Sequence, residues 1–263
     1  MLIKVIRLVM RFLVKSNLNL VKALIIDFNR IIGRGYGSES VSQEVEMAIH
    51  LLKSVSKKNL VVFDVGANVG NYTAELLKYP IVDFVYSFEP SEKTWASLNQ
   101  RFKGSSRVSP VKQALGSVNE SQVLYSDSEL SGLASLSRRR LEHFNIDFSK
   151  SELVKVGTLS AYVGTLGKIP DFVKIDVEGH ELNVLLGSLD ILHKVKLIQF
   201  EFGGCNIDTK TYFQDFWYFF VENKFELYRI TSDRILKITE YSEEDEYFKT
   251  TNYFALNTRF ILS

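Results

Sequence analysis

Length, composition and charge limit the kind of protein that this sequence encodes. The 263 residues suffice for one α/β domain with additions, and a hydrophobic fraction of 46% is typical of a folded protein. The single cysteine, Cys205, excludes an internal disulfide and is consistent with a reducing compartment. Residues 1–37 hold seven Lys or Arg and one Asp, a net +6, which leaves −5 for the rest of a chain of net charge +1. A mildly acidic body does not favour a nucleic-acid partner.

The first 37 residues are predicted to form a basic unit that precedes a domain at residues 38–263. Glycines and polar residues at 33–38 predict the linker between the two parts. A second helix is predicted over residues 18–32, after a first helix over residues 1–15. In that first helix apolar residues surround a narrow stripe of four cations at helical spacing: Lys4, Arg7, Arg11 and Lys15.

Residues 1–32 leave two kinds of partner open. The basic amphipathic pattern suits peripheral contact with an anionic membrane face, and it equally suits packing on a protein surface. The segment is not predicted to span a membrane, because no run of about 18 residues is free of charge. It is a poor signal peptide, because Arg11 interrupts its apolar region. The expected location is therefore cytoplasmic, with peripheral contact at the inner membrane face as one option, and the oligomeric state stays open.

A glycine-containing loop after a buried strand is the most informative stretch. The apolar run at residues 60–63 predicts a strand of a parallel sheet, and residues 71–78 predict the helix that follows. The loop lacks the middle glycine of a dinucleotide fingerprint, so an NAD-type oxidoreductase is disfavoured. Its acidic residue would repel phosphate and favour an amine-bearing or cationic ligand such as S-adenosylmethionine (SAM). The candidate cofactor residues here are Asp64, Gly66, Ala67, Asn68 and Gly70.

The next two predicted strands supply two further cofactor candidates. The strand at residues 81–88 ends at Glu89, about 20 residues after the glycine loop, where a carboxylate accepts the two ribose hydroxyls of an adenosine. The strand at residues 108–115 carries Gln113 near its end, where an adenine edge is often met. Residues 126–137 are polar and rich in small side chains, which predicts a mobile loop over the mouth of the pocket.

A second acidic stretch follows the strand predicted at residues 171–176. Asp176 ends this strand and is expected to face the same crevice as the glycine loop. Asp176, Glu178 and His180 are the candidate catalytic residues, since they can position a hydroxyl or remove its proton. Glu181 opens the next predicted helix, and Glu201 lies in an apolar strand predicted at residues 196–202, where a carboxylate is costly unless it is used. No metal site is predicted.

The remaining pattern completes an α/β domain. Residues 42–54, 91–102 and 211–223 predict helices, and the aromatic residues of the last are expected in the core rather than as a substrate platform. Residues 121–126 and 153–158 predict edge strands, and residues 225–230 and 252–257 predict two closing strands.

The motifs DVGANVG, FEP, QALG, KIDVEGHE and QFEF occur in this order, and together they resemble the FkbM family of SAM-dependent methyltransferases. The resemblance implies the class I methyltransferase fold, a Rossmann-like, mostly parallel sheet of seven strands with helices on both faces and one antiparallel strand near the edge. It also implies O-methylation, commonly of a sugar or polyketide hydroxyl. Ser160 stands where the family usually has an acidic residue, so no role is carried over to that position.

The function expected from these residues is SAM-dependent transfer of a methyl group to a hydroxyl, most simply that of a sugar in a glycan or glycolipid. Asp176 or His180 is expected to be the general base, Glu89 the ribose acid, and Glu181 and Glu201 acceptor contacts. The alternative is a non-catalytic SAM-binding scaffold in a membrane-associated glycan assembly complex, which would bind the cofactor without turnover.

Overall fold

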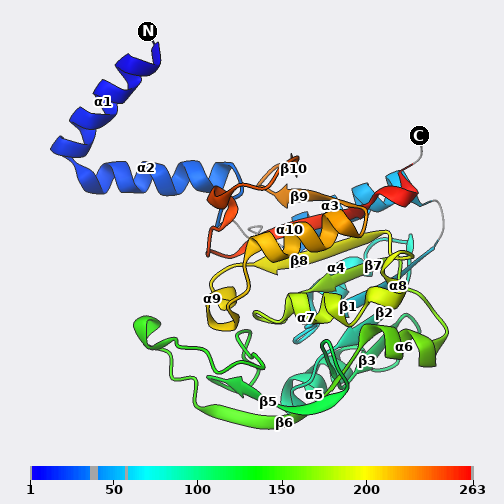
Figure 1. Cartoon of the computed structure of the whole chain (residues 1–263). Coiled ribbons are helices and arrows are strands. Elements are labelled where there is room, and N and C mark those ends of the chain that lie inside the picture. Colours follow the sequence, from blue (N-terminus) through cyan, green and yellow to red (C-terminus); the bar gives the residue numbers. More distant parts are fainter. Residues whose placement is uncertain (1, 36–40, 57–58, 262–263) are drawn as a thin grey trace.

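A central sheet with helices on both faces forms the body of the molecule (Figure 1). The computed structural model describes residues 2–35, 41–56 and 59–261. In spatial order the sheet consists of β10 (Ile235–Ile238), β9 (Phe225–Ile230), β11 (Thr251–Asn257), β8 (Leu197–Phe202), β7 (Phe172–Ile175), β1 (Leu60–Val65), β2 (Val82–Phe88) and β3 (Val108–Val111).

The sheet has the predicted class I methyltransferase arrangement with one difference. Strands β3, β2, β1, β7 and β8 run parallel, and β11 is antiparallel to both β8 and β9. The sheet has eight strands rather than the expected seven, because β10 pairs with β9 at the edge. Its four residues follow a short turn at 231–234 and carry no strong strand pattern, so sequence reading missed them.

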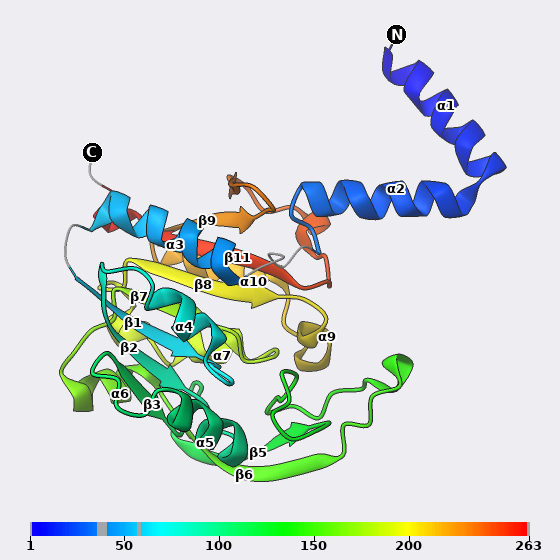
Figure 2. The ribbon, with the colours of Figure 1, turned by 180° about the vertical axis from the view of Figure 1, so that it is seen from behind.

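Two apolar layers cover the two faces of the sheet. On one face, residues of α3 (Val41–Val55) and α4 (Asn71–Leu76) pack against β1, β2 and β11, and these helices lie in front of the sheet in Figure 2. On the other, the apolar residues come from α6 (Leu159–Leu166), α7 (Glu181–Leu186), α8 (Leu189–Leu192) and α10 (Phe213–Glu222). Rings of α10 stack on Phe200 of β8, so the aromatic residues of this helix belong to the core, as predicted.

A small second sheet lies beside the main one and carries the segment between residues 126 and 150. It has the order β4 (Ala114–Leu115), β6 (Lys150–Gly157) and β5 (Glu120–Ser126). The expectation of an edge strand is therefore right for β5 and wrong for β6, which pairs on both sides. The strand predicted over residues 108–115 is divided between the sheets, because the chain leaves the main sheet after Val111 and joins β6 at Ala114.

The N-terminal helices project from this body. Helices α1 (Leu2–Ser16) and α2 (Leu18–Ile31) extend beyond the central sheet in both ribbon views (Figures 1 and 2). The chain after α2 is fixed to the domain, since Arg34 lies 3.4 Å from the carboxylate of Asp245 and the amide of Gly35 donates to Thr251 Oγ1 at 2.8 Å. The predicted boundary at residue 37 lies outside the described residues. No helix in the described ranges is both long and apolar enough to cross a bilayer.

Candidate active site

The glycine loop bends sharply at the carboxyl end of β1 and packs directly on the end of β7. Gly66, Asn68 and Gly70 all have positive φ values, of 76°, 49° and 83°. A Cβ atom on Gly66 would lie only 1.8 Å from the carbonyl oxygen of Asp176, so only glycine fits at this contact. The close approach brings the first residues of the loop and Asp176 together, as the sequence predicted for strand ends that share one edge of a sheet.

A buried lysine joins the two strand ends beneath the loop. Lys174 Nζ lies 3.5 Å from Asp64 and 3.4 Å from Asp176, and it donates to the carbonyl of Gly66 at 3.1 Å. Burial alone would lower the pKa of Lys174, but the charges of Asp176 and Asp64 outweigh it and raise that pKa. Lys174 is therefore charged, and it fixes Asp64, which is fully buried and also accepts a hydrogen bond from Thr73 at 2.7 Å.

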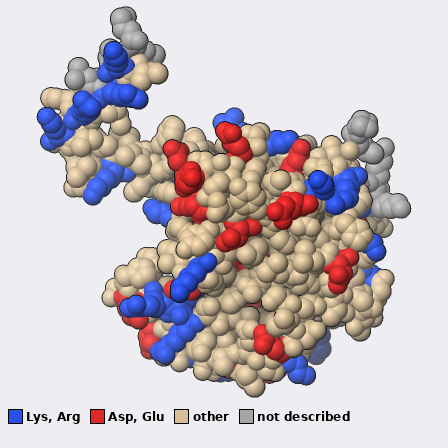
Figure 3. Space-filling view, viewed as in Figure 1, with Lys and Arg blue, Asp and Glu red and all other residues tan. Residues whose placement is uncertain are grey.

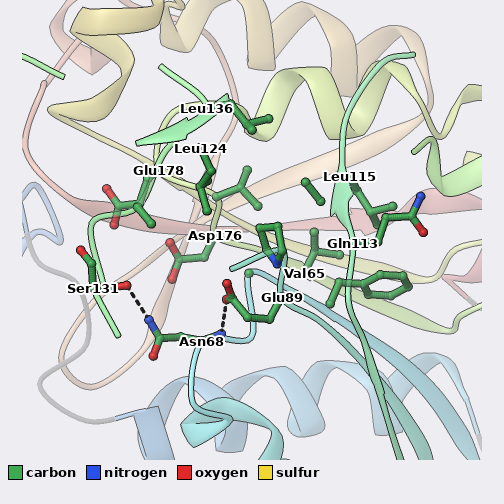
Figure 4. Close-up of a pocket in the computed structure, with 17 residues that line it drawn as sticks. Val65, Asn68, Glu89, Gln113, Leu115, Leu124, Ser131, Leu136, Asp176 and Glu178 are labelled. Atoms are coloured by element: carbon green, nitrogen blue, oxygen red, sulfur yellow. Dashed lines mark hydrogen bonds between the residues drawn. The ribbon is translucent and has the colours of Figure 1, made fainter. Parts of the chain in front are cut away.

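A first cavity opens between the glycine loop, the end of β2 and the small sheet. Figure 4 shows its residues as sticks, with the carboxylates of Glu89 and Asp176 near Asn68, and with Gln113 and Leu115 toward the opposite end. Leu124 and Leu136 border it from the small sheet and the segment that follows β5. The cavity thus joins a polar, acidic end to an apolar end.

Glu89 is held at the polar end by backbone donors. Its carboxylate accepts hydrogen bonds from the amides of Asn68, at 3.0 Å, and Ser91, at 2.9 Å. Burial raises the pKa of Glu89 to about 7, and these two hydrogen bonds limit the rise. Each carboxylate oxygen keeps a further lone pair, so the group can still accept from a ligand hydroxyl.

Gln113 lines the first cavity but rests against the small sheet. Its Nε2 would lie 2.0 Å from a Cβ atom on Gly157, so the amide covers that glycine closely. An adenine contact by Gln113 stays a prediction. The neighbouring residues Ala114 and Leu115 are buried and offer an apolar surface at the same end.

The segment after β5 forms a cover over the cavity, which we call the cover segment (residues 131–140). Ser131, Gly132, Ala134 and Leu136 line the first cavity, so the predicted position of this loop is confirmed. Asn68 Nδ2 donates to the carbonyl of Ser131 at 3.0 Å, as drawn in Figure 4. Arg139 has its side chain largely buried and donates to Glu178. In the sequence Arg139 is one of three consecutive arginines at 138–140, and the chain order does not show its partner Glu178.

A second cavity lies on the other side of the same loop. It shares Gly66, Asn68 and Asp176 with the first, so the two cavities meet at these residues. Its other lining residues come from the glycine loop, the start of α3, the start of α4 and the strands β7, β8 and β11: Val41, Glu44, Ala67, Asn71, Tyr72, Lys174, Ile175, Gln199, Phe200 and Asn252.

A polar network in the second cavity was not predicted. Tyr72 donates to Gln199 at 2.6 Å, and both Gln199 and Asn252 donate to the carboxylate of Glu44 at 2.7 Å. Burial raises the pKa of Glu44, while these hydrogen bonds lower it. The available signal was Gln199 inside the apolar run of β8, since buried amides in strands need partners. The identity of the partners follows only from the folded structure.

The acidic turn after β7 places its residues in different surroundings. Glu178 has a φ of 54° and lines the first cavity. Burial and the charge of Asp176 raise its pKa to about 8, although Arg139 opposes the rise. Glu181 is fully buried, and its Oε1 accepts from the amides of Val177 at 3.0 Å and Gly179 at 3.1 Å. Glu181 thereby holds the shape of the turn, and a contact with the acceptor stays a prediction.

His180 and Glu201 flank the turn without lining either cavity. His180 Nε2 lies 3.0 Å from the hydroxyl of Ser137, and burial lowers the pKa of His180, so the ring is neutral near pH 7. Glu201, Glu178 and Cys205 each place one ligand atom within 4.8 Å of the others. Burial and nearby carboxylates raise the pKa values of Glu201 and Cys205, so the thiol of Cys205 holds its proton at neutral pH. The cluster therefore offers hydrogen-bond donors as well as acceptors.

The structure brings together part of the predicted site. Among the described residues, the first cavity is lined by the predicted Gly66, Asn68, Glu89, Gln113, Asp176 and Glu178, and the second adds Ala67. The other predicted site residues lie outside both linings: Asp64, Gly70, His180, Glu181 and Glu201. Their roles in binding or catalysis stay predictions.

The chain is similar to several known proteins. The chain is 27% identical over 152 residues to the hexuronic acid methyltransferase AglP of Haloferax volcanii, which covers 57% of this chain and 59% of that protein. Among solved structures, magnesium protoporphyrin IX methyltransferase from Synechocystis, with bound SAM, has a TM-score of 0.44 at 15% identity, covering 90% of this chain and 97% of the other. A SAM-dependent O-methyltransferase from Thermotoga maritima has a TM-score of 0.41 at 12% identity, covering 87% of this chain and 70% of the other.

The model of the methyltransferase FkbM domain matches residues 64–228, well over half of the chain, and the match runs from the glycine loop through the acidic turn to β9. The chain therefore belongs to the FkbM methyltransferase family.

Proposed function

We propose that this protein binds SAM and transfers its methyl group to a hydroxyl of a sugar that carries a carboxylate, as in a hexuronic acid. The observation that carries the proposal is the meeting of the two cavities at Gly66, Asn68 and Asp176. A site of this form provides one compartment for a nucleoside and a second compartment next to it. The name of the relative AglP supports the choice of a hexuronic acid.

The residues of the first cavity fit the adenosine part of the cofactor. Glu89 would accept the ribose hydroxyls, because its two oxygens face the cavity while backbone amides hold it in place. The apolar lining residues Leu115, Leu124 and Leu136 suit an adenine ring. Gly66 allows the loop to pack directly on the end of β7, since a Cβ atom there would clash with the carbonyl of Asp176.

The residues of the second cavity fit a charged amino-acid group. Lys174 offers a buried cation and Glu44 a carboxylate, and both line this space together with Asn71 and Asn252. A methionine moiety carries one carboxylate and one ammonium, which match these two charges. We infer that the amino-acid end of SAM lies here and that Asp176, at the junction, faces the reacting centre.

Bound SAM would supply an electrophilic methyl group. The acceptor oxygen would bond to the methyl carbon as the carbon–sulfur bond breaks with its electron pair on sulfur, and the hydroxyl would give up its proton. The protein contributes alignment first, since the loop and strand ends form a packed, hydrogen-bonded frame. Asp176 would take the hydroxyl proton, because it lines both cavities, and a general base adds about 10²–10⁴ in rate. Lys174 orients the carboxylate of Asp176 by its ion pair.

Calorimetric titration with SAM tests the cofactor assignment. The wild type should bind, and Glu89→Ala should bind at least tenfold more weakly, while Glu222→Ala, which removes an exposed carboxylate on α10, should bind like the wild type. Equal binding by Glu89→Ala and the wild type would remove Glu89 from the ribose role. Failure of the wild type to bind SAM would refute SAM as the cofactor.

Incubation with isotopically labelled SAM and defined oligosaccharides tests the acceptor. Oligosaccharides that contain a hexuronic acid should gain labelled methyl groups as ethers, stable to mild alkali, whereas matched neutral oligosaccharides should gain far fewer. Label on the carboxylate, lost in mild alkali as a methyl ester, would overturn O-methylation of a hydroxyl. SAM binding with no transfer to any sugar would support the non-catalytic scaffold.

A further inference from the structure

The two N-terminal helices expose an unusual amount of apolar surface. In α1 the side chains of Ile3, Ile6, Met10, Phe12 and Val14 are exposed, and Phe12 reaches 71%. In α2 the exposed apolar residues include Leu20, Leu24, Phe28 and Ile31, which recur at helical spacing along one side. Burial of such surface is favourable by about 25 cal/mol per Å², so an exposed apolar helix pair indicates a binding surface.

The charges on these two helices are mostly positive, with Asp27 of α2 as the single acidic residue. The stripe of Lys4, Arg7, Arg11 and Lys15 follows one face of α1, and Figure 3 shows basic groups gathered on the projecting arm. Residues 1–26 contain no Asp or Glu, whereas the rest of the chain beyond residue 37 is net acidic. An apolar helix face bordered by a narrow cationic stripe is complementary to an anionic lipid surface, where acyl chains receive the apolar side and headgroups receive the cations.

The position of the arm is set by contacts with the domain. A Cβ atom on Gly33 would lie 2.7 Å from the carbonyl oxygen of Ile230, and Arg34 lies 3.6 Å from Glu244 and 3.4 Å from Asp245. The end of α2 is thus fixed to β9 and to the short 3-10 helix Glu243–Asp245. The arm therefore presents its surface in a defined direction relative to the sheet.

We propose that α1 and α2 bind the surface of an anionic membrane and turn the active-site edge of the domain toward it. In both ribbon views the arm projects on the side of the sheet to which the chain runs from β8 into α9 (Cys205–Thr209), which is the carboxyl edge (Figures 1 and 2). The tip around Glu142–Phe144 extends on that side too. Phe144 is exposed, and so are the nearby chain residues Arg138 and Arg140.

This arrangement places the cavity edge between two elements that can touch lipid. An acceptor sugar linked to a lipid would then reach the junction at Asp176 without leaving the membrane surface. This second step rests on the proposed function, whereas binding of the arm to the membrane does not.

Vesicle sedimentation of the full chain tests the proposal. The wild type should sediment with phosphatidylcholine vesicles that contain phosphatidylglycerol, and much less with phosphatidylcholine alone. Reversal of the stripe by Lys4→Glu, Arg7→Glu, Arg11→Glu and Lys15→Glu should lower the partition coefficient at least about a hundredfold, since each cation contributes roughly fivefold near an anionic surface. The matched control reverses four exposed lysines of the domain, Lys53, Lys103, Lys155 and Lys194, and should bind like the wild type.

A second variant tests the apolar side without changing charge. Ile6→Ser, Met10→Ser and Phe12→Ser together should weaken binding to the same vesicles at least tenfold. Binding that both arm variants retain would overturn the proposal. The proposal would also be overturned if the wild type did not bind anionic vesicles but formed a dimer in light scattering, and if the serine variant lost that dimer. The apolar face would then bind a second copy of the chain.

Calorimetry with SAM on the same variants separates the two proposals. The charge-reversed protein should bind SAM like the wild type, since none of its substitutions lies in either cavity lining. Vesicle binding without SAM binding would leave the membrane assignment standing and refute the proposed function. SAM binding and methyl transfer without vesicle binding would support the proposed function and refute the membrane assignment.

Discussion

The ammonium of Lys174 lies 3.4 Å from the carboxylate of Asp176, at the point where the two cavities meet. The lysine is almost fully buried, and the same ammonium also compensates the buried charge of Asp64. A single cation therefore joins a structural carboxylate under the glycine loop to a carboxylate that faces the cavity. Stability and site geometry are coupled through this residue.

Removal of the buried ammonium should destabilise the domain strongly. Lys174→Met leaves the carboxylate of Asp64 buried without its ion pair, and breaking such a pair costs about 3–5 kcal/mol. Asp64→Asn in the same chain should recover part of this loss, because the uncompensated charge is gone. Guanidinium unfolding measures both, with the exposed Lys194→Met as control, expected within about 0.5 kcal/mol of the wild type. A Lys174→Met protein of wild-type stability would contradict the role of this ion pair.

Substitutions at two glycines with similar backbone angles can distinguish the cost of backbone strain from the cost of a steric clash. Gly66 and Gly104 have φ values of 76° and 82°, but a Cβ on Gly66 would lie 1.8 Å from a carbonyl oxygen while Gly104 has open space. Gly104→Ala should cost about 1–2 kcal/mol from the left-handed conformation alone. Gly66→Ala should cost more by at least about 2 kcal/mol and should reduce binding to SAM, as measured by urea unfolding and calorimetry. Equal losses would show that the contact between the loop and Asp176 relaxes freely.

The buried carboxylate of Glu181 should make stability depend on pH. Burial raises its pKa to about 7, so the folded state holds a proton that the unfolded state, with a pKa near 4.5, releases earlier. The stabilisation from this proton is complete below pH 4.5 and is lost as the pH rises through 7. Glu181→Gln keeps an oxygen for the amides of Val177 and Gly179 but does not titrate.

We therefore expect the free energy of unfolding of Glu181→Gln, relative to the wild type, to increase by about 2–3 kcal/mol between pH 5 and pH 8. Urea unfolding at several pH values measures this difference. The exposed Glu222→Gln should show no such trend. A constant difference across the range would mean that the pKa of Glu181 is not raised.

The base can be identified by comparing two neighbouring residues. Asp176 lines both cavities, whereas His180 Nε2 lies 3.0 Å from Ser137, in the cover segment, and lines neither. If the proposed function holds, Asp176→Asn should lower kcat by about 10²–10⁴ and leave the fold intact. His180→Gln should lower kcat less than tenfold. A larger fall in kcat for His180→Gln than for Asp176→Asn would assign the base to the histidine, provided that the pH profile of kcat for His180→Gln also loses one limb.

The sequence predicted the features that depend on local order along the chain. Strands that end in Asp64, Glu89 and Asp176 are recognisable because apolar runs stop at a carboxylate, and parallel strands bring such ends to one edge. The glycines at 66 and 70 mark the turn between β1 and α4. These signals sufficed for the fold class and for much of the lining of the first cavity.

The features that escaped prediction depend on contacts between distant parts of the chain. Glu44 meets Gln199 across 155 positions, and nothing in the pattern of either helix or strand indicates that pairing. Arg139 stands in a run of three arginines, and its buried position beside Glu178 depends on the fold rather than on that run. The extra strand β10 is short and depends on its pairing with β9 rather than on its own pattern.

The cover segment has a consequence for the timing of turnover. A ligand in the first cavity lies beneath residues that also hold the cover in place, through the contacts of Ser131 with Asn68 and of Arg139 with Glu178. If the proposed function holds, release of the demethylated cofactor is expected to break these contacts, which would re-form once in each cycle. Product release, rather than methyl transfer, would then limit the rate of turnover. The contact between Arg139 and Glu178 is largely buried, so salt should screen it only weakly and turnover should change little with ionic strength.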